Sequence, residues 1–122
     1  MRLQESGEMY LETILVLSQQ QEHVRAIDVG EHMGFSKPSV SRAMGILRTN
    51  GFVETDEAGC LMLTDSGREV AEKTYERHRV LTGLFVSLGV RREIAAEDAC
   101  KIEHDLSDES FEALMRAAKR LE

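Results

Sequence analysis

The chain has 122 residues, of which 42% are hydrophobic and 30% charged, as in an ordinary globular protein of one domain or two small modules. Its net charge of −7 excludes a nonspecific polycation, although a local basic face can still bind DNA. No apolar run has the length of a membrane helix, and the N-terminus has carboxylates where a signal peptide carries cations. We therefore expect a cytoplasmic protein without a membrane partner, in which Cys60 and Cys100 are free thiols.

The first half of the chain shows helical periodicity and strong capping signals. Hydrophobic spacing predicts an amphipathic helix over 7–20, which a polar loop follows, and a short helix over 25–34 that ends at Gly34. The next helix is predicted to begin after the N-cap Ser36, with a proline tolerated in its first turn, and to end at the sequence Asn-Gly.

Two short β-runs surround a turn in "FVETDEAGCLMLT", which predicts a hairpin. Thr64 is then expected to cap a long helix that reaches about Gly89. Two more helices are predicted over 92–105 and, after the cap Ser107, over 108–121. The expected fold is mainly α: a winged helix-turn-helix domain over 1–72 and a helical metal-binding and dimerisation domain over 73–122.

The helix after the turn "GFS" is the candidate recognition helix, because its start offers short polar and cationic groups of the kind that contact base edges. Residues 37–51 contain three cations and no carboxylate, although the whole chain is acidic. The alternative interpretation is an ordinary solvated cationic face. The candidate DNA-binding residues are Ser36, Lys37, Pro38, Ser39, Ser41, Arg42 and Arg48.

The hairpin tip is expected to contribute little to DNA affinity. Its side chains include Glu54, Asp56 and Glu57, which are repelled by phosphates. Affinity and specificity are therefore assigned to the recognition helix.

The stretch "EDACKIEHDLS" suggests a metal site, since Cys100, Glu103 and His104 share one side of a helix. Three ligands from one helix rarely complete a transition-metal shell, so other segments must contribute. Met9, Glu12 and His78 are the candidates. Each residue has a simpler alternative, for example a core methionine, a solvated glutamate, a polar histidine on an exposed helix or a small buried cysteine.

Five motifs carry a resemblance that spans almost the whole chain. They are "GEMYLETILVL", "FSKPSVSRAM", "LTDSGREVA", "RHRVL" and "EDACKIEHDLSDE". In this order they resemble the diphtheria toxin repressor and manganese transport regulator (DtxR/MntR) family of iron- or manganese-dependent repressors. The resemblance implies a homodimer that holds metal between the dimerisation half and the first helix.

The resemblance also implies a ligand set. Met9, Cys100, Glu103 and His104 match the primary site of the iron type, whereas Glu12 and His78 match ligands of the manganese type. This chain departs from the iron type at that type's ancillary metal site, because Thr82 and Ala96 stand where a Glu and a His are needed. No SH3-like third domain is expected.

The leading hypothesis is a metal-activated repressor of metal homeostasis that binds a pseudo-palindromic operator in double-stranded DNA. Sulfur ligands favour Fe²⁺ over Mn²⁺, with Co²⁺ or Ni²⁺ as substitutes in vitro. The alternative is a winged-helix regulator that senses an oxidant or a small organic ligand. An enzyme is disfavoured, since the sequence has neither a glycine-rich phosphate loop nor a plausible nucleophile–base pair.

Overall fold

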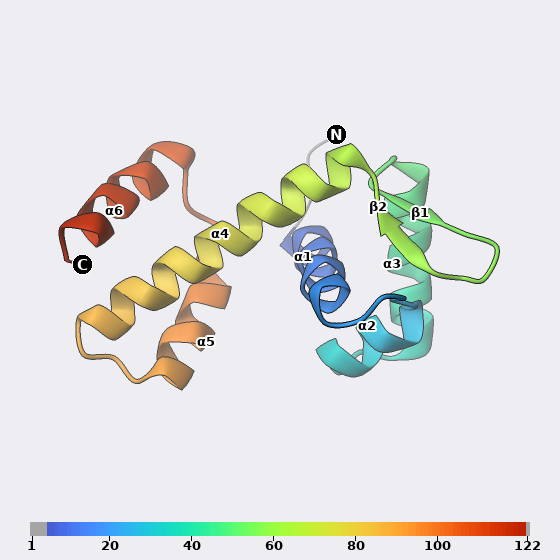
Figure 1. Cartoon of the computed structure of the whole chain (residues 1–122), viewed down its shortest axis with the longest axis horizontal. Coiled ribbons are helices and arrows are strands. Elements are labelled where there is room, and N and C mark those ends of the chain that lie inside the picture. The colour runs from blue at the N-terminus through green and yellow to red at the C-terminus, as the bar shows by residue number, and fades with distance from the viewer. Residues whose placement is uncertain (1–4, 122) are drawn as a thin grey trace. The chain divides into compact units, whose positions relative to one another are not determined.

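A computed structural model of the chain describes residues 5–121, which form six helices and one β-hairpin (Figure 1). The elements are α1 (Glu5–Gln20), α2 (Ala26–Met33), α3 (Lys37–Thr49), β1 (Val53–Thr55), β2 (Leu61–Leu63), α4 (Asp65–Ser87), α5 (Arg92–Ile102) and α6 (Asp108–Arg120). They divide into two compact units, one ending at Glu72 and the other beginning at Lys73. The predicted class, a winged helix-turn-helix followed by a helical domain, is confirmed.

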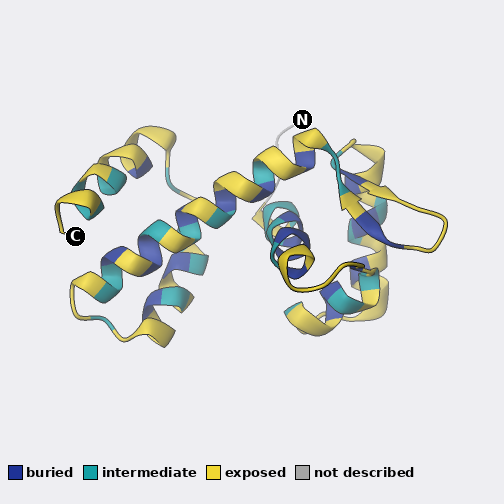
Figure 2. Ribbon diagram, in the orientation of Figure 1, coloured by how far each residue is buried: buried dark blue, intermediate teal, exposed yellow. Residues whose placement is uncertain are grey.

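The N-terminal unit is built around α1, which packs against α2, α3 and β2. Its buried side chains are almost all aliphatic, in agreement with a chain that has few aromatic residues (Figure 2). The main ones are Leu11, Ile14, Leu15, Leu17, Val24, Val29, Val40, Met44, Leu47, Val53 and Leu61. Burial of this apolar surface fixes the orientation of α3, whose other face carries the candidate DNA-binding residues.

Local capping chemistry makes the turn between α2 and α3. Gly34 takes a left-handed conformation with φ of 72°, and its N–H donates to the carbonyl of Gly30 at 2.9 Å. Ser36 then caps α3, because its hydroxyl oxygen accepts from the N–H of Ser39. Pro38 lies in the first turn of α3, where no intrahelical donor is lost. Both predicted helix boundaries are confirmed.

The wing is a short antiparallel hairpin in which Val53 pairs with Leu63 and Thr55 with Leu61. Its tip is closed by Asp56, whose carboxylate accepts from the N–H groups of Ala58 and Cys60, both at 2.9 Å. The hairpin also bonds to the segment before α2, since the N–H of Leu61 donates to the carbonyl of Val24. The tip is exposed and acidic, as the sequence predicts.

The turn before β1, at residues 51–52, packs directly on the first turn of α4. The hydroxyl of Thr64 donates to the carbonyl of Gly51 at 2.7 Å and accepts from the N–H of Gly67 at 3.1 Å. The N–H of Thr64 donates to the carbonyl of Phe52. Thr64 therefore caps α4, as predicted, and also fixes the turn that leads into β1.

The C-terminal unit contains the later part of α4 with α5 and α6 (Figure 1). Ser107 caps α6 through the N–H of Ser110, as predicted. The helix predicted over 92–105 is too long, because α5 ends at Ile102 and Glu103 is its C-cap. The carbonyl of Glu103 accepts a hydrogen bond from a side chain of α4, and the chain then turns toward α6.

Two smaller details complete the fold. The first helix ends at Gln20, as predicted, and begins at Glu5, two residues earlier than predicted. Among residues 5–121, no helix combines the length and the apolar character needed to cross a membrane.

Candidate metal centre and nucleic-acid interface

Six of the seven candidate DNA-binding residues lie on the surface of α3 and the seventh, Ser36, is its N-cap; each of them is exposed. The opposite face of the helix, with Val40, Met44 and Leu47, is buried in the core. Arg42 and Arg48 are thus free to extend from a helix whose first turn contains no acidic residue. The arrangement suits contact with phosphates and base edges in a major groove.

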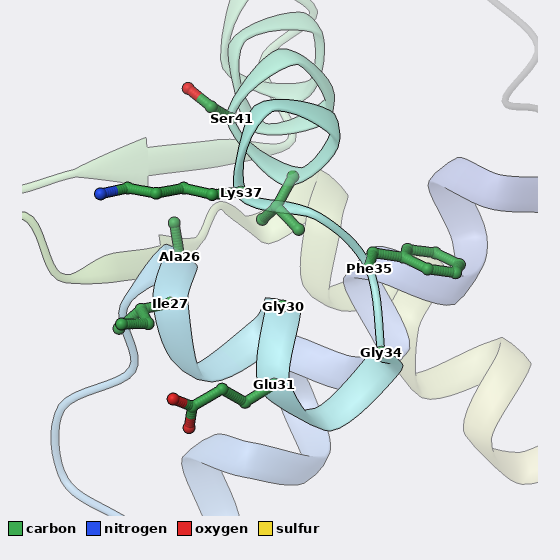
Figure 3. A pocket seen from close by; sticks show the side chains of 9 residues that line it. Ala26, Ile27, Gly30, Glu31, Gly34, Phe35, Lys37 and Ser41 are labelled. Atoms are coloured by element: carbon green, nitrogen blue, oxygen red, sulfur yellow. The ribbon is translucent and has the colours of Figure 1, made fainter.

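A groove of about 360 Å³ lies between α2 and the start of α3 (Figure 3). Ile27 and Glu31 project from α2, while Lys37 and Ser41 come from α3. Phe35, in the turn, is partly exposed, and its ring meets that of Tyr10 edge-on at 5.9 Å. The turn is therefore held to α1 by an aromatic contact in addition to its caps.

A buried carboxylate lies at the centre of the ligand cluster in the C-terminal unit. The Glu103 side chain is fully buried, and its Oε2 lies 2.9 Å from Nδ1 of His78 on α4. Its other oxygen, Oε1, lies 3.4 Å from Nε2 of His104, whose side chain is 2% exposed. The structure therefore brings His78, Glu103 and His104 together.

Oε1 of Glu103 accepts no hydrogen bond from any described residue. A buried carboxylate oxygen without a donor is costly unless a positive charge compensates it. Cys100 lies one turn earlier on α5, half-buried and outside any disulfide. Carboxylate, imidazole and thiol together are donors that a first-row divalent metal accepts, so these residues fit a metal ion.

Arg77 on α4, which is not among the predicted site residues, holds this cluster in place. It is 6% exposed, and its Nη1 donates to the carbonyls of Glu103 at 3.1 Å and Leu106 at 2.6 Å. Its guanidinium also stacks over the ring of Phe111, 5.2 Å from the ring centre. One signal could have located it, since Thr74, Arg77, Leu81 and Leu84 follow helical core spacing and are all buried.

The same arginine anchors α6. Its Nη2 donates to the carboxylate of Asp108 at 2.6 Å, and the ammonium of Lys73 lies 2.9 Å from the same oxygen. The hydrogen bond and charge of Lys73, with the charge and hydrogen bond of Arg77, lower the pKa of Asp108. Asp108 therefore stays ionised at neutral pH in the first turn of α6, where a negative charge is favourable.

Met9 and Glu12 lie one turn apart on α1, in the N-terminal unit, and both are half-buried. Both lie inside α1, where the hydroxyl of Thr13 also donates to the carbonyl of Met9 at 2.8 Å. Their spacing puts a thioether and a carboxylate on the same side of α1. His23 and His32 are exposed.

Comparisons with known proteins find two family domains in this chain. Residues 2–61 match the family described as iron dependent repressor, N-terminal DNA binding domain. Residues 64–122 match iron dependent repressor, metal binding and dimerisation domain. The chain belongs to the DtxR/MntR family of metal-dependent transcriptional repressors.

Three members illustrate the family's similarity to this chain. The transcriptional regulator MntR of Escherichia coli O6:H1 is 33% identical over 104 residues, which are 85% of this chain and 67% of the relative. The diphtheria toxin repressor of Corynebacterium diphtheriae is 28% identical over 118 residues, 96% of this chain and 52% of that protein. A solved manganese-dependent transcriptional repressor in complex with manganese is 29% identical with a TM-score of 0.85, covering 93% of this chain and 52% of the other.

This DtxR/MntR chain spans about half the length of several solved members that it matches. Its curated relatives are transcriptional repressors and regulators, so the expectation that it is not an enzyme is confirmed. The match to a DNA binding domain covers most of the N-terminal unit, and the match to a metal binding and dimerisation domain covers the C-terminal unit.

Proposed function

We propose that this protein is a metal-activated repressor that binds a pseudo-palindromic operator as a homodimer and prefers Fe²⁺ to Mn²⁺. The observation that carries the proposal is the buried Glu103, whose Oε1 accepts no hydrogen bond from the described residues and lies beside His104. A site of this kind is completed by a cation.

The proposed ligands come from both units of the chain. His78, Cys100, Glu103 and His104 belong to the C-terminal unit, and Met9 and Glu12 belong to α1 of the DNA-binding unit. A bound divalent ion supplies positive charge that offsets the two carboxylates. In this proposal, binding from both sides restrains α1, and through it α3, so that the two recognition helices of a dimer fit successive half-sites.

DNA is recognised by the exposed face of α3. Its cations neutralise phosphates, and Arg42 has the length and donors to pair with a guanine edge. One helix covers only a few base pairs, which is why a dimer with two symmetric helices is needed for useful specificity. The second family match, to a dimerisation domain, supports this assembly.

The preference for Fe²⁺ rests on sulfur. Thioether and thiolate are soft donors, whereas Mn²⁺ prefers carboxylate and water. Glu12 favours the harder ion, and two solved relatives are named as a manganese regulator and a manganese-dependent repressor, so Mn²⁺ is the competing metal. Co²⁺ and Ni²⁺ are expected to replace the physiological ion in vitro.

The test exchanges the two sulfur ligands for carboxylates. The double variant Met9→Asp with Cys100→Glu is expected to shift activation of DNA binding toward Mn²⁺, whereas the wild type is activated at a lower Fe²⁺ concentration than Mn²⁺. The measurement is anaerobic titration of operator binding with each metal. Met62→Asp, at an exposed methionine of the wing, is the control and should leave the metal ranking unchanged.

Two results would contradict the proposal. A wild type that prefers Mn²⁺, or a double variant with an unchanged ranking, would show that sulfur does not set selectivity. Equal DNA binding with and without chelator would instead favour a regulator that senses an oxidant or an organic ligand.

A further inference from the structure

The candidate recognition helix α3 carries an apolar side chain, Ile46, that is not buried in the core of the N-terminal unit. Ile46 is 52% exposed and lies about 100–120° around α3 from the buried Val40 and Leu47. Counting from Ser39, it lies at i+7, and Arg42 lies at i+3. Homeodomain recognition helices present their base-contacting side chains at i, i+3, i+4 and i+7. Ile46 therefore shares the base-reading face with Arg42.

The neighbouring residue, Gly45, gives an independent indication. It lies inside α3, where glycine weakens a helix relative to alanine. A Cβ added to Gly45 would meet no atom of the described residues within 4 Å. No contact seen within the chain therefore requires a glycine here. A missing side chain lets the helix backbone come nearer to another molecule.

We propose that Ile46 reads a thymine in the operator by packing against its 5-methyl group, and that Gly45 allows α3 to approach the base closely enough. The inference rests on the proposed function, because it takes α3 as the helix in the major groove. Among the four bases only thymine presents a methyl group there, and apolar side chains contact it. The three cations of α3 and its lack of carboxylates make DNA the occupant of this face.

The geometry also limits where the thymine lies. Four residues of helix rise about 6 Å, and base pairs are about 3.4 Å apart. The thymine read by Ile46 is therefore within about two base pairs of the position read by Arg42. This relation should appear in every half-site that the protein selects.

The experiment begins with selection of duplexes from a randomised library by the full chain, with Mn²⁺ and, in a parallel anaerobic arm, with Fe²⁺. Each thymidine of the selected half-site is then replaced by deoxyuridine, which removes only the methyl group. At one position this change should weaken wild-type binding by about fourfold per half-site, which is the change in affinity that corresponds to burial of one methyl group. Ile46→Ala should bind the thymine and uracil duplexes equally.

Ile27→Ala is the matched control, because Ile27 is an exposed isoleucine of the same unit on α2. It should keep the full sensitivity to deoxyuridine. If no thymine of the half-site shows this sensitivity in the wild type, or if Ile46→Ala keeps it, the methyl contact is overturned.

Gly45→Ala provides a second readout that a purely structural role would not give. The variant should unfold at a higher temperature than the wild type, since alanine favours the helix and meets no neighbour. It should nevertheless bind the selected duplex about tenfold or more weakly, the scale of an overpacked contact. Unchanged binding would overturn the close approach. Failure of the wild type to select any sequence with metal would instead reject the proposed function itself.

Discussion

Glu103→Gln is expected to remove most of the stabilisation that metal gives to this protein. Glutamine keeps the size of the side chain but loses the charge that the cation compensates. Loss of this proposed ligand should weaken metal binding by at least about 100-fold, because changing a residue that only supports a ligand already costs about 10- to 100-fold. At a metal concentration of 100 times Kd, the wild type gains about 2.7 kcal/mol, and a 100-fold weaker variant gains only about 0.4 kcal/mol.

The measurement is the free energy of unfolding with and without Mn²⁺ or Fe²⁺. The metal-free variant should stay within about 1 kcal/mol of the wild type, because Arg77 bonds the main-chain carbonyl of Glu103 and keeps that contact. Glu97→Gln, at an exposed position of α5, is the control and should retain the full metal effect. A Glu103→Gln variant that metal stabilises as strongly as the wild type would remove Glu103 from the site.

Gly67→Ala is expected to destabilise the N-terminal unit by about 3 kcal/mol, at the upper end of the usual cost of overpacking. A Cβ at this position would lie 2.0 Å from the carbonyl oxygen of Phe52 and 3.0 Å from its carbonyl carbon. That carbonyl accepts from the N–H of Thr64, so it cannot move without breaking the junction between the wing and α4. Urea unfolding of the metal-free protein measures the loss.

The control lies on the same helix. Gly83 is exposed, and an added Cβ would meet nothing within 4 Å, so Gly83→Ala should stabilise the protein by about 0.5–1 kcal/mol. Opposite signs for the same substitution on one helix would isolate the contact with Phe52. Equal effects at the two glycines would refute the close packing of the two turns.

The sequence predicts the helix boundaries best where a cap is chemically local. Gly34, Ser36, Thr64 and Ser107 all act as expected, because each satisfies backbone groups within three or four residues of itself. The hairpin could also be predicted, since its strands and turn lie within 13 residues of sequence. Local chemistry is sufficient for these features.

Features that depend on contacts between residues far apart in the sequence could not be predicted from local chemistry. Arg77 is charged and next to His78, which suggests exposure, yet it is buried because the carbonyls after α5 and the ring of Phe111 surround it. The same contact explains why α5 ends at Ile102 and why His104 follows the helix instead of lying on it. The roles of the individual metal ligands and DNA-binding residues remain predictions.

The central claim is that metal binding and operator binding are coupled, and one measurement tests it most directly. Coupling between two ligands is reciprocal, and it usually amounts to about 1–3 kcal/mol, which corresponds to a factor of about 5–150 in affinity. The measurement is the Kd for metal of the full chain with and without the selected operator duplex, under anaerobic conditions for Fe²⁺. The proposed function predicts tighter metal binding in the presence of the operator by a factor in this range. Equal metal affinity with and without the operator would contradict it.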